Sequence, residues 1–310
     1  MSILSTLFRP KSSEVVARDA EALRLILGVG RSGTSWVSQV LAKTSKPCRF
    51  FSEPLFHIEP RLPFHREGDH TATGYEKKIL PDHPLTTAYR LLLAPKLKQL
   101  KAPALERNDA NWEICLVKEV HALLGTEGLL RLWKIPCLFL LRDPIYIVDS
   151  LFAAQTLNTI YLMHETVLVQ QEGFLNRFAS ARRQIVEELF HQAGGRPARE
   201  KTILQKLICV QLLQDMFGVL AAEFPWARAM RYEDVCQQPQ ESFREIARYL
   251  SLTWDQSMEA ALMETMRETD TPADPYSIVR NTAAQNRRPL KFISEEELIL
   301  CQATLKSMGA

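Results

Sequence analysis

The sequence lacks the features that would place it at once in a broad functional class. Its 310 residues hold 38 lysines and arginines against 36 aspartates and glutamates, so the formal net charge is only +2. Such a balance gives no overall basic surface for a nucleic acid, although basic residues can still gather in one pocket. No internal repeat and no low-complexity tract divides the chain. We expect no nucleic-acid partner, a loosely ordered arm over residues 1–20 and one domain over residues 21–310.

The sequence also has no continuous apolar run near the roughly 18 residues that a membrane span requires. The apolar part of MSILSTLFRPKSS, residues 1–13, is too short before Arg9 for a secretory signal. The six cysteines show no CxxC or other metal-ligand spacing, and several lie in apolar runs. We therefore expect reduced core thiols, no metal, no membrane span and a cytoplasmic location.

Short apolar or β-rich runs alternate with helical patterns along the chain. The runs cover residues 23–29, 48–54, 113–120, 137–144 and 227–234. This alternation predicts an α/β fold with three layers, P-loop-like, in which a central parallel sheet is flanked by helices. Residues 55–111 break the rhythm with many prolines and histidines, and we expect them to form an excursion over the site. Ligands of such sheets bind beyond the carboxyl ends of the strands.

The segment GVGRSGTS, residues 28–35, resembles a phosphate-binding loop without its lysine. Thr34 stands where the Walker A pattern places the lysine. Glycines such as Gly30 and Gly33 permit a close approach of the backbone, and the loop opens a helix whose free N–H groups favour an anion. The missing lysine argues against ordinary ATP or GTP turnover. A glycine turn that only joins a strand to a helix remains the simpler alternative.

A second candidate cluster lies in FLLRDPIYIVDSLF, where Arg142 ends an apolar run and Ser150 follows eight residues later. Pro144 suits the first turn of a helix, which would put Ser150 about two turns along it. A bidentate guanidinium and a hydroxyl together suit a second phosphate group. A local ion pair or turn at the strand end is the alternative.

These two segments, followed by MRYEDVCQQPQESFREIARYLSL (230–252), resemble in order and spacing the sulfotransferase superfamily that uses 3'-phosphoadenosine 5'-phosphosulfate (PAPS), and most of all its carbohydrate and bacterial branches. The resemblance implies PAPS as the donor cosubstrate and no metal. It implies that the first loop grips the 5'-phosphosulfate and that the second cluster grips the 3'-phosphate. The residues concerned are Gly30, Arg31, Ser32, Gly33, Thr34, Ser35, Arg142 and Ser150. By analogy with phosphoryl transfer, Arg31 would offset the charge on the departing phosphate.

The acceptor must lose a proton, so a base is needed near the loop. Glu53 is the first candidate, because it follows the second strand and its phrase FFSEP is similar to an FEP phrase of carbohydrate sulfotransferases. His57 and His121 compete with it, and Lys118 could contact oxygens of the donor or the acceptor. A carboxylate that caps a strand end, an ordinary loop histidine and a solvated lysine are the structural alternatives.

Late in the chain, IVRNTAAQNRRPLKF (278–292) gathers basic residues. The family commonly closes its nucleotide site with a late basic loop, so Arg280 and Arg288 are weighed as cofactor-binding residues against a plain basic surface. Trp36 is expected in the core, because its helix is amphipathic.

The sequence thus predicts transfer of a sulfuryl group to a hydroxyl or amine of a carbohydrate, lipid or small-molecule acceptor. A P-loop kinase-like enzyme and a non-catalytic nucleotide-binding protein are the two alternatives. Residues 55–111 and 152–164 are expected to line the acceptor pocket, and the identity of the acceptor and the oligomeric state cannot be read from the sequence.

Overall fold

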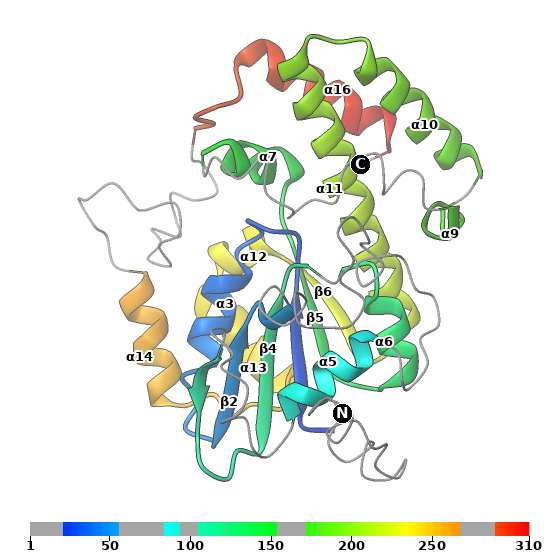
Figure 1. Cartoon of the computed structure of the whole chain (residues 1–310). Helices are drawn as coiled ribbons and strands as arrows, with labels where there is room; N and C mark the ends of the chain where they lie inside the picture. The colour runs from blue at the N-terminus through cyan, green and yellow to red at the C-terminus, as the bar shows by residue number, and fades with distance from the viewer. Residues whose placement is uncertain are drawn as a thin grey trace, which may run out of the picture.

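The computed structural model describes residues 21–55, 84–93, 105–121, 123–153, 172–178, 180–266 and 289–309. A six-stranded sheet of order β3-β2-β4-β1-β5-β6 forms its centre (Figure 1). All neighbouring strands pair in parallel except β3, which runs antiparallel to β2 at one edge. The strands are β1 (Leu23–Leu27), β2 (Cys48–Ser52), β3 (Leu105–Asn108), β4 (Ile114–Glu119), β5 (Cys137–Leu141) and β6 (Ala227–Arg231).

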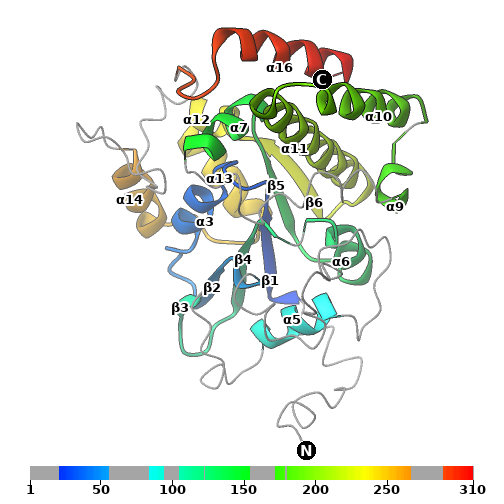
Figure 2. The same cartoon turned by 45° about the horizontal axis from the view of Figure 1, so that its top comes forward.

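Helices cover both faces of the sheet, which confirms the predicted three-layer α/β fold (Figure 2). One face packs against α5 (Pro84–Leu93), α6 (Thr126–Leu132), α7 (Pro144–Ala153) and α11 (Ala198–Glu223). The other packs against α3 (Thr34–Leu41), α12 (Tyr232–Gln237), α13 (Pro239–Tyr249) and α14 (Gln256–Thr265). The remaining described helices are α9 (Glu172–Leu175), α10 (Ser180–Gly194) and α16 (Glu295–Ser307), of which α10 and α16 pack on α11.

Alternation along each strand divides the apolar side chains between the two layers. In β1, Leu25 and Leu27 belong to the core under α11, whereas Ile26 belongs to the core under α3. In β5, Phe139 and Leu140 divide in the same way. Successive side chains of a strand point to opposite faces, so strands buried on both sides read as continuous apolar runs. This is why five of the six strands were visible in the sequence.

Strand β3 was not expected from the sequence. It lies in the segment that we expected to form an excursion, and its exposed and half-buried residues alternate along LERN. The same segment contributes α5, whose Leu85, Ala88 and Leu92 are fully or almost fully buried in the core. The described parts of residues 55–111 therefore supply an edge strand and a core helix.

Within the part of the chain that the structure describes, α11 alone is long and apolar enough to cross a membrane. The sequence shows no continuous apolar run here, because polar residues such as Lys206 and Gln211 lie between the apolar ones. Of its most apolar stretch of 18 residues, 72 % is buried inside the fold, where the helix packs on β5, β6 and α7. A core helix passes the same test of length and composition, so this property alone does not indicate a membrane span.

All six cysteines are free and buried, as expected for core thiols. Burial raises the pKa of the Cys48 thiol to about 11, so this thiol stays protonated at neutral pH. Trp36 is also in the core as predicted: it is 1 % exposed, and its ring meets those of Tyr232 and Phe243 edge to face.

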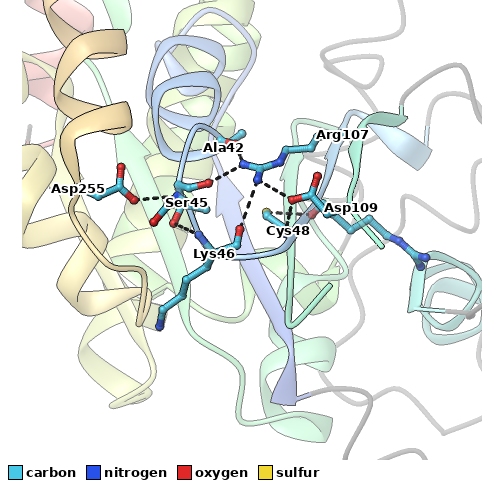
Figure 3. A network of polar contacts seen from close by, with 9 residues as sticks. Ala42, Ser45, Lys46, Cys48, Arg107, Asp109 and Asp255 are labelled. Carbon is cyan, nitrogen blue, oxygen red and sulfur yellow. Dashed lines mark hydrogen bonds and ion pairs between the residues drawn. The ribbon is translucent and has the colours of Figure 1, made fainter. Parts of the chain in front are cut away.

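The end of α3 far from the candidate loop is fastened by a polar network (Figure 3). The Arg107 guanidinium donates to the carbonyl oxygens of Ala42 and Thr44 at 2.5 and 2.7 Å. Asp109 accepts from the same guanidinium and from the backbone N–H of Cys48, whereas Asp255 accepts from the N–H of Ser45 at 2.7 Å. A cation at the carboxyl end of a helix satisfies its last carbonyls and its dipole, so this network fixes α3 in place.

Candidate functional site

The loop between β1 and α3 adopts a conformation that glycine permits at two points. Gly33 has φ of 97°, and a Cβ built there would lie 2.4 Å from the Tyr232 ring. A Cβ on Gly28 would lie 2.9 Å from the carbonyl oxygen of Leu140. Gly30 differs, because a Cβ there would meet nothing within 4 Å. The loop is therefore pressed against β5 and α12 on one side, and its surface at Gly30 is open.

This loop has polar groups that no side chain in the described part of the chain satisfies. Gly33 occupies the N-cap of α3 and provides no side chain to cap the first N–H groups of the helix. The Ser32 side chain is 1 % exposed, and its hydroxyl has no hydrogen-bond partner in the described part of the chain. Because buried polar atoms are almost always paired, these groups fit an anionic ligand at the loop. Thr34 is buried beside them, and Ser35 is half-buried at the first turn of α3.

Three residues predicted from two distant motifs come together at this loop. Arg31, with φ of 73°, donates from Nε to the Ser150 hydroxyl at 3.0 Å. Arg142 donates from its guanidinium to the carbonyl oxygen of Arg31 at 2.8 Å. The Arg142 Cζ also lies 4.8 Å from the centroid of the Tyr232 ring, a cation–π contact. The structure therefore joins the ends of β1, β5 and β6 around two guanidinium groups.

Two acceptors, on helices that cover opposite faces of the sheet, hold the turn after β5. Gln214 on α11 accepts from the N–H of Arg142 at 2.9 Å, and Glu233 on α12 accepts from the N–H of Asp143 at 2.8 Å. The Asp143 carboxylate in turn accepts from the N–H of Ile145, which caps the first turn of α7. This turn was predicted as the start of a helix at Pro144, whereas its partners Gln214 and Glu233 were not expected.

Asp149, the residue before Ser150, fastens a different part of the chain. Its carboxylate is fully buried and accepts from the N–H groups of Lys291, Phe292 and Ile293 at 2.9, 2.8 and 3.3 Å. These N–H groups belong to the segment directly before α16. Two adjacent residues of α7 therefore bind the candidate loop and the C-terminal segment. Sequence analysis missed Asp149, although an aspartate inside an apolar helix is a recognisable signal.

A second polar cluster lies at the ends of β2 and β4. The Glu53 carboxylate forms an ion pair with Lys118, and its other oxygen lies 3.4 Å from His121 Nε2. The side chains of Lys118 and His121 are only 3 % and 5 % exposed, whereas that of Glu53 is 25 % exposed. Glu53 and His121, which the sequence offered as alternative bases, thus form one contact group with Lys118, which was predicted to contact oxygens of the donor or the acceptor.

The electrostatics of this cluster favour a charged Glu53. Burial alone would raise the pKa of Glu53, but the hydrogen bond from His121 and the charge of Lys118 lower this pKa to about 2. The carboxylate is therefore ionised at every pH near neutrality. A base is most effective when its pKa lies near the working pH, so these values suit Glu53 to orienting its partners better than to accepting a proton.

Glu119 holds the backbone around this cluster. Its carboxylate is fully buried and accepts from the N–H groups of Leu55, Val120 and His121 at 3.1, 2.8 and 2.9 Å. Burial raises the pKa of Glu119. The turn after β2 and the turn after β4 are therefore tied to one side chain, which fixes the spacing between Glu53 and His121.

Three predicted residues, His57, Arg280 and Arg288, lie outside the described residues. Their assignments to the base and to the nucleotide site stay predictions. Lys291, close to the basic stretch, is exposed and contributes its backbone N–H to Asp149. Among the described residues there is no group of three or more histidine, cysteine, aspartate or glutamate side chains placed to hold a metal ion.

Comparison with known proteins gave matches in structure only. No protein-family model and no curated protein matches the chain in sequence. A mouse sulfotransferase complexed with PAP (3'-phosphoadenosine 5'-phosphate) is similar over 96 % of this chain and 89 % of its own chain, with 12 % identity and a TM-score of 0.44. A retinol dehydratase in complex with androsterone and the inactive cofactor PAP is similar over 94 % of this chain and 81 % of its own, with 15 % identity and a TM-score of 0.40.

Proposed function

We propose that this protein is a sulfotransferase that moves a sulfuryl group from PAPS to a hydroxyl or amine. The observation that carries the proposal is the meeting of Arg31, Arg142 and Ser150 at an uncapped helix start whose loop lacks the Walker lysine. The resemblance of the motifs implies a donor with two separate phosphate sites. The two guanidinium groups and the unpaired Ser32 hydroxyl supply charge and hydrogen bonds suited to such a donor.

The residues of the loop would act on the leaving phosphate. In the reaction, the bond between sulfur and the bridging oxygen of the 5'-phosphate breaks while a bond forms from sulfur to the acceptor atom. Negative charge then grows on the departing phosphate, where Arg31 and the N–H groups at the start of α3 would stabilise it. Arg142 and Ser150 would hold the 3'-phosphate, so that the sulfur is kept in line with the acceptor.

The cluster at the ends of β2 and β4 would take the proton of the acceptor. We assign the acid–base role to His121 and an orienting role to Glu53, because the low pKa of Glu53 makes it a weak base. Lys118 forms an ion pair with Glu53, and its ammonium group would contact an oxygen of the donor or the acceptor. The alternative, in which Glu53 is itself the base, can be tested by the dependence of kcat/KM on pH.

The acceptor class within this proposal stays broad: a carbohydrate, a lipid or another small molecule. The free, buried state of all six cysteines is compatible with the reducing, cytoplasmic location that we propose. A kinase-like alternative requires a triphosphate with magnesium, and Thr34 stands where its lysine would be. A non-catalytic protein would bind the nucleotide and change no substrate.

Transfer itself is the direct test. The protein is incubated with PAPS and a panel of sugars, lipid alcohols, phenols and amines, and mass spectrometry follows both the sulfated acceptor and the release of 3'-phosphoadenosine 5'-phosphate (PAP). We expect one acceptor class to be sulfated and Arg31→Ala to abolish transfer. Arg183→Ala is the matched control, because Arg183 forms an ion pair with Glu187 on the surface of α10. Binding of PAP without transfer to any acceptor would favour the non-catalytic alternative.

A further inference from the structure

The side-chain amide nitrogen of Gln214 has no hydrogen-bond partner among the described residues. The residue is 8 % exposed and lies on α11, beside the carboxyl end of β5. Its Oε1 accepts from the N–H of Arg142 at 2.9 Å. Its Nε2 is buried and has no hydrogen-bond partner in the described part of the chain.

The orientation of this amide follows from its partner. The amide oxygen and nitrogen of a glutamine have similar shapes, so they are assigned from the hydrogen bonds that they make. Here the partner is a backbone N–H, which can only donate, so oxygen must face Arg142 and nitrogen must face away. Because both atoms share one carbon, Nε2 lies beside the same strand end. Exchanging them would leave two donors facing each other and would satisfy neither.

None of the described side chains near this strand end accepts a hydrogen bond from Nε2. The Arg142 and Arg31 guanidinium groups only donate, and the Ser150 hydroxyl already accepts from Arg31. Glu233 uses one oxygen on the N–H of Asp143, and its other oxygen forms an ion pair with Arg231 Nε at 3.6 Å. Buried donors in folded proteins nearly always find an acceptor, so an idle one on the side chain that holds the backbone of Arg142 indicates an oxygen supplied by a ligand.

We infer that Gln214 is a further binding residue, whose Nε2 donates to an oxygen of the nucleotide's 3'-phosphate while its Oε1 fixes the backbone of Arg142. The inference rests on the proposed function, because it takes the ligand at Arg142 to be a nucleotide with a 3'-phosphate. Gln214 then contributes to selection of such a nucleotide over one with a free 3'-hydroxyl. The residue acts on the ligand directly and also positions the arginine that binds it.

The substitution Gln214→Glu tests the inference with little change in shape. Glutamate keeps an oxygen for the N–H of Arg142 but replaces the Nε2 donor with a second, negatively charged oxygen. We expect the calorimetric Kd for PAP to rise by at least about 10-fold, the range of a lost hydrogen bond to a charged group. The Kd for 5'-AMP, which lacks the 3'-phosphate, should change by less than about 3-fold. A role that is only structural would weaken both ligands alike.

Gln211→Glu is the matched control, with the same substitution one turn earlier on α11. Gln211 donates to Asp215 at 2.7 Å, and we expect its variant to bind PAP as the wild type does. If Gln214→Glu does not fold, the side-chain amide resonances of Gln214 in the wild-type protein supply a second measurement. They should shift on addition of PAP and stay in place on addition of 5'-AMP.

The outcomes separate this inference from the function on which it rests. A wild type that binds PAP no better than 5'-AMP overturns both. A wild type that prefers PAP, together with a Gln214→Glu variant that keeps the whole preference, overturns the role of Gln214 and leaves the proposed function standing. Side-chain amide resonances of Gln214 that do not shift on addition of PAP would also overturn the role of Gln214 and leave the proposed function standing.

Discussion

Arg31 and Ser150 are joined by a hydrogen bond of 3.0 Å from Nε to Oγ, although 119 residues separate them in the chain. The bond links the loop after β1 to the second turn of α7. The backbone of Arg31 lies in the left-handed region, with φ of 73°, a conformation that persists only where the surrounding structure holds it. The proposed grip on the two ends of the donor therefore depends on this contact.

Removing the hydroxyl should weaken donor binding. In Ser150→Ala, Arg31 loses its acceptor and the 3'-phosphate loses a donor, so we expect the Kd for PAP to rise roughly 10-fold or more, as for other hydrogen bonds to charged groups. Calorimetry measures the change. Ser38→Ala is the matched control, because the buried Ser38 hydroxyl donates only to the carbonyl oxygen of Ser35 within α3. Equal affinities of all three proteins would contradict the role of Ser150.

Two glycines of the loop should respond differently to alanine. In Gly33→Ala, the new methyl group meets the Tyr232 ring and the backbone keeps a positive φ, so we expect a loss of about 2–4 kcal/mol in the free energy of unfolding. In Gly30→Ala the methyl group meets nothing within 4 Å, so the loss should stay near or below about 1 kcal/mol. Urea unfolding of both variants checks this order. A reversed order would mean that Tyr232 does not lie against Gly33.

The lowered pKa of Glu53 predicts how stability depends on acid. The folded-state pKa of about 2 lies below the ordinary value of 4.5, so the charged carboxylate stabilises the folded protein. This contribution, of order 2–3 kcal/mol, is complete above pH 4.5 and is lost as the pH falls from about 4.5 to about 2. Urea unfolding along this pH range should show a steeper loss of stability in the wild type than in Glu53→Gln. Parallel curves would show that Glu53 has no charged partner.

The same pKa separates the candidate bases in a rate measurement. Glu53 stays ionised from pH 5 to pH 9, so it cannot produce a change of kcat/KM with pH in that range. We therefore expect the shape of the kcat/KM profile between pH 5 and pH 9 to be the same in Glu53→Gln as in the wild type, whereas His121→Asn should remove most of the activity. A profile that changes its shape in Glu53→Gln, or full activity in His121→Asn, would assign the base elsewhere.

Asp149 should control the C-terminal segment. In Asp149→Ala, three backbone N–H groups lose their acceptor, so we expect the free energy of unfolding to drop by about 3 kcal/mol and hydrogen exchange at residues 291–293 to quicken. Asp149→Asn keeps an oxygen acceptor and should lose less. Asp255→Ala removes a helix cap on α14 and should leave exchange at 291–293 unchanged. Unaltered hydrogen exchange at residues 291–293 in Asp149→Ala would contradict the role of Asp149 as their acceptor.

Much of the fold could be predicted because buried parallel strands leave a strong pattern. Each of β1, β2, β4, β5 and β6 lies in one of the expected apolar or β-rich runs. The edge strand β3 could not be predicted, because LERN is short and only half-buried and so lacks an apolar run. The length of the apolar helix α11 could not be read either, because polar residues such as Lys206 and Gln211 interrupt its apolar run.

The candidate site was predicted where its residues stand at the ends of strands and missed where they act from a distance. Arg31, Arg142 and Ser150 belong to local motifs, and their convergence follows from the order of the parallel strands. Gln214 and Glu233 reach the same site from helices that begin far along the chain. Nothing around Gln214 marks it, and Glu233 lies in the segment 230–252 without any sign that it contacts the turn after β5. Contacts of this kind depend on packing between layers, which a single sequence does not specify.

The most direct test of the whole account is calorimetric titration with PAP, beside 5'-AMP and Mg-ATP, on the wild type and on Arg142→Ala. We predict tight binding of PAP that weakens greatly when either the 3'-phosphate or the Arg142 guanidinium is removed. A preference for Mg-ATP, or binding of none of the three nucleotides, would contradict the sulfotransferase proposal.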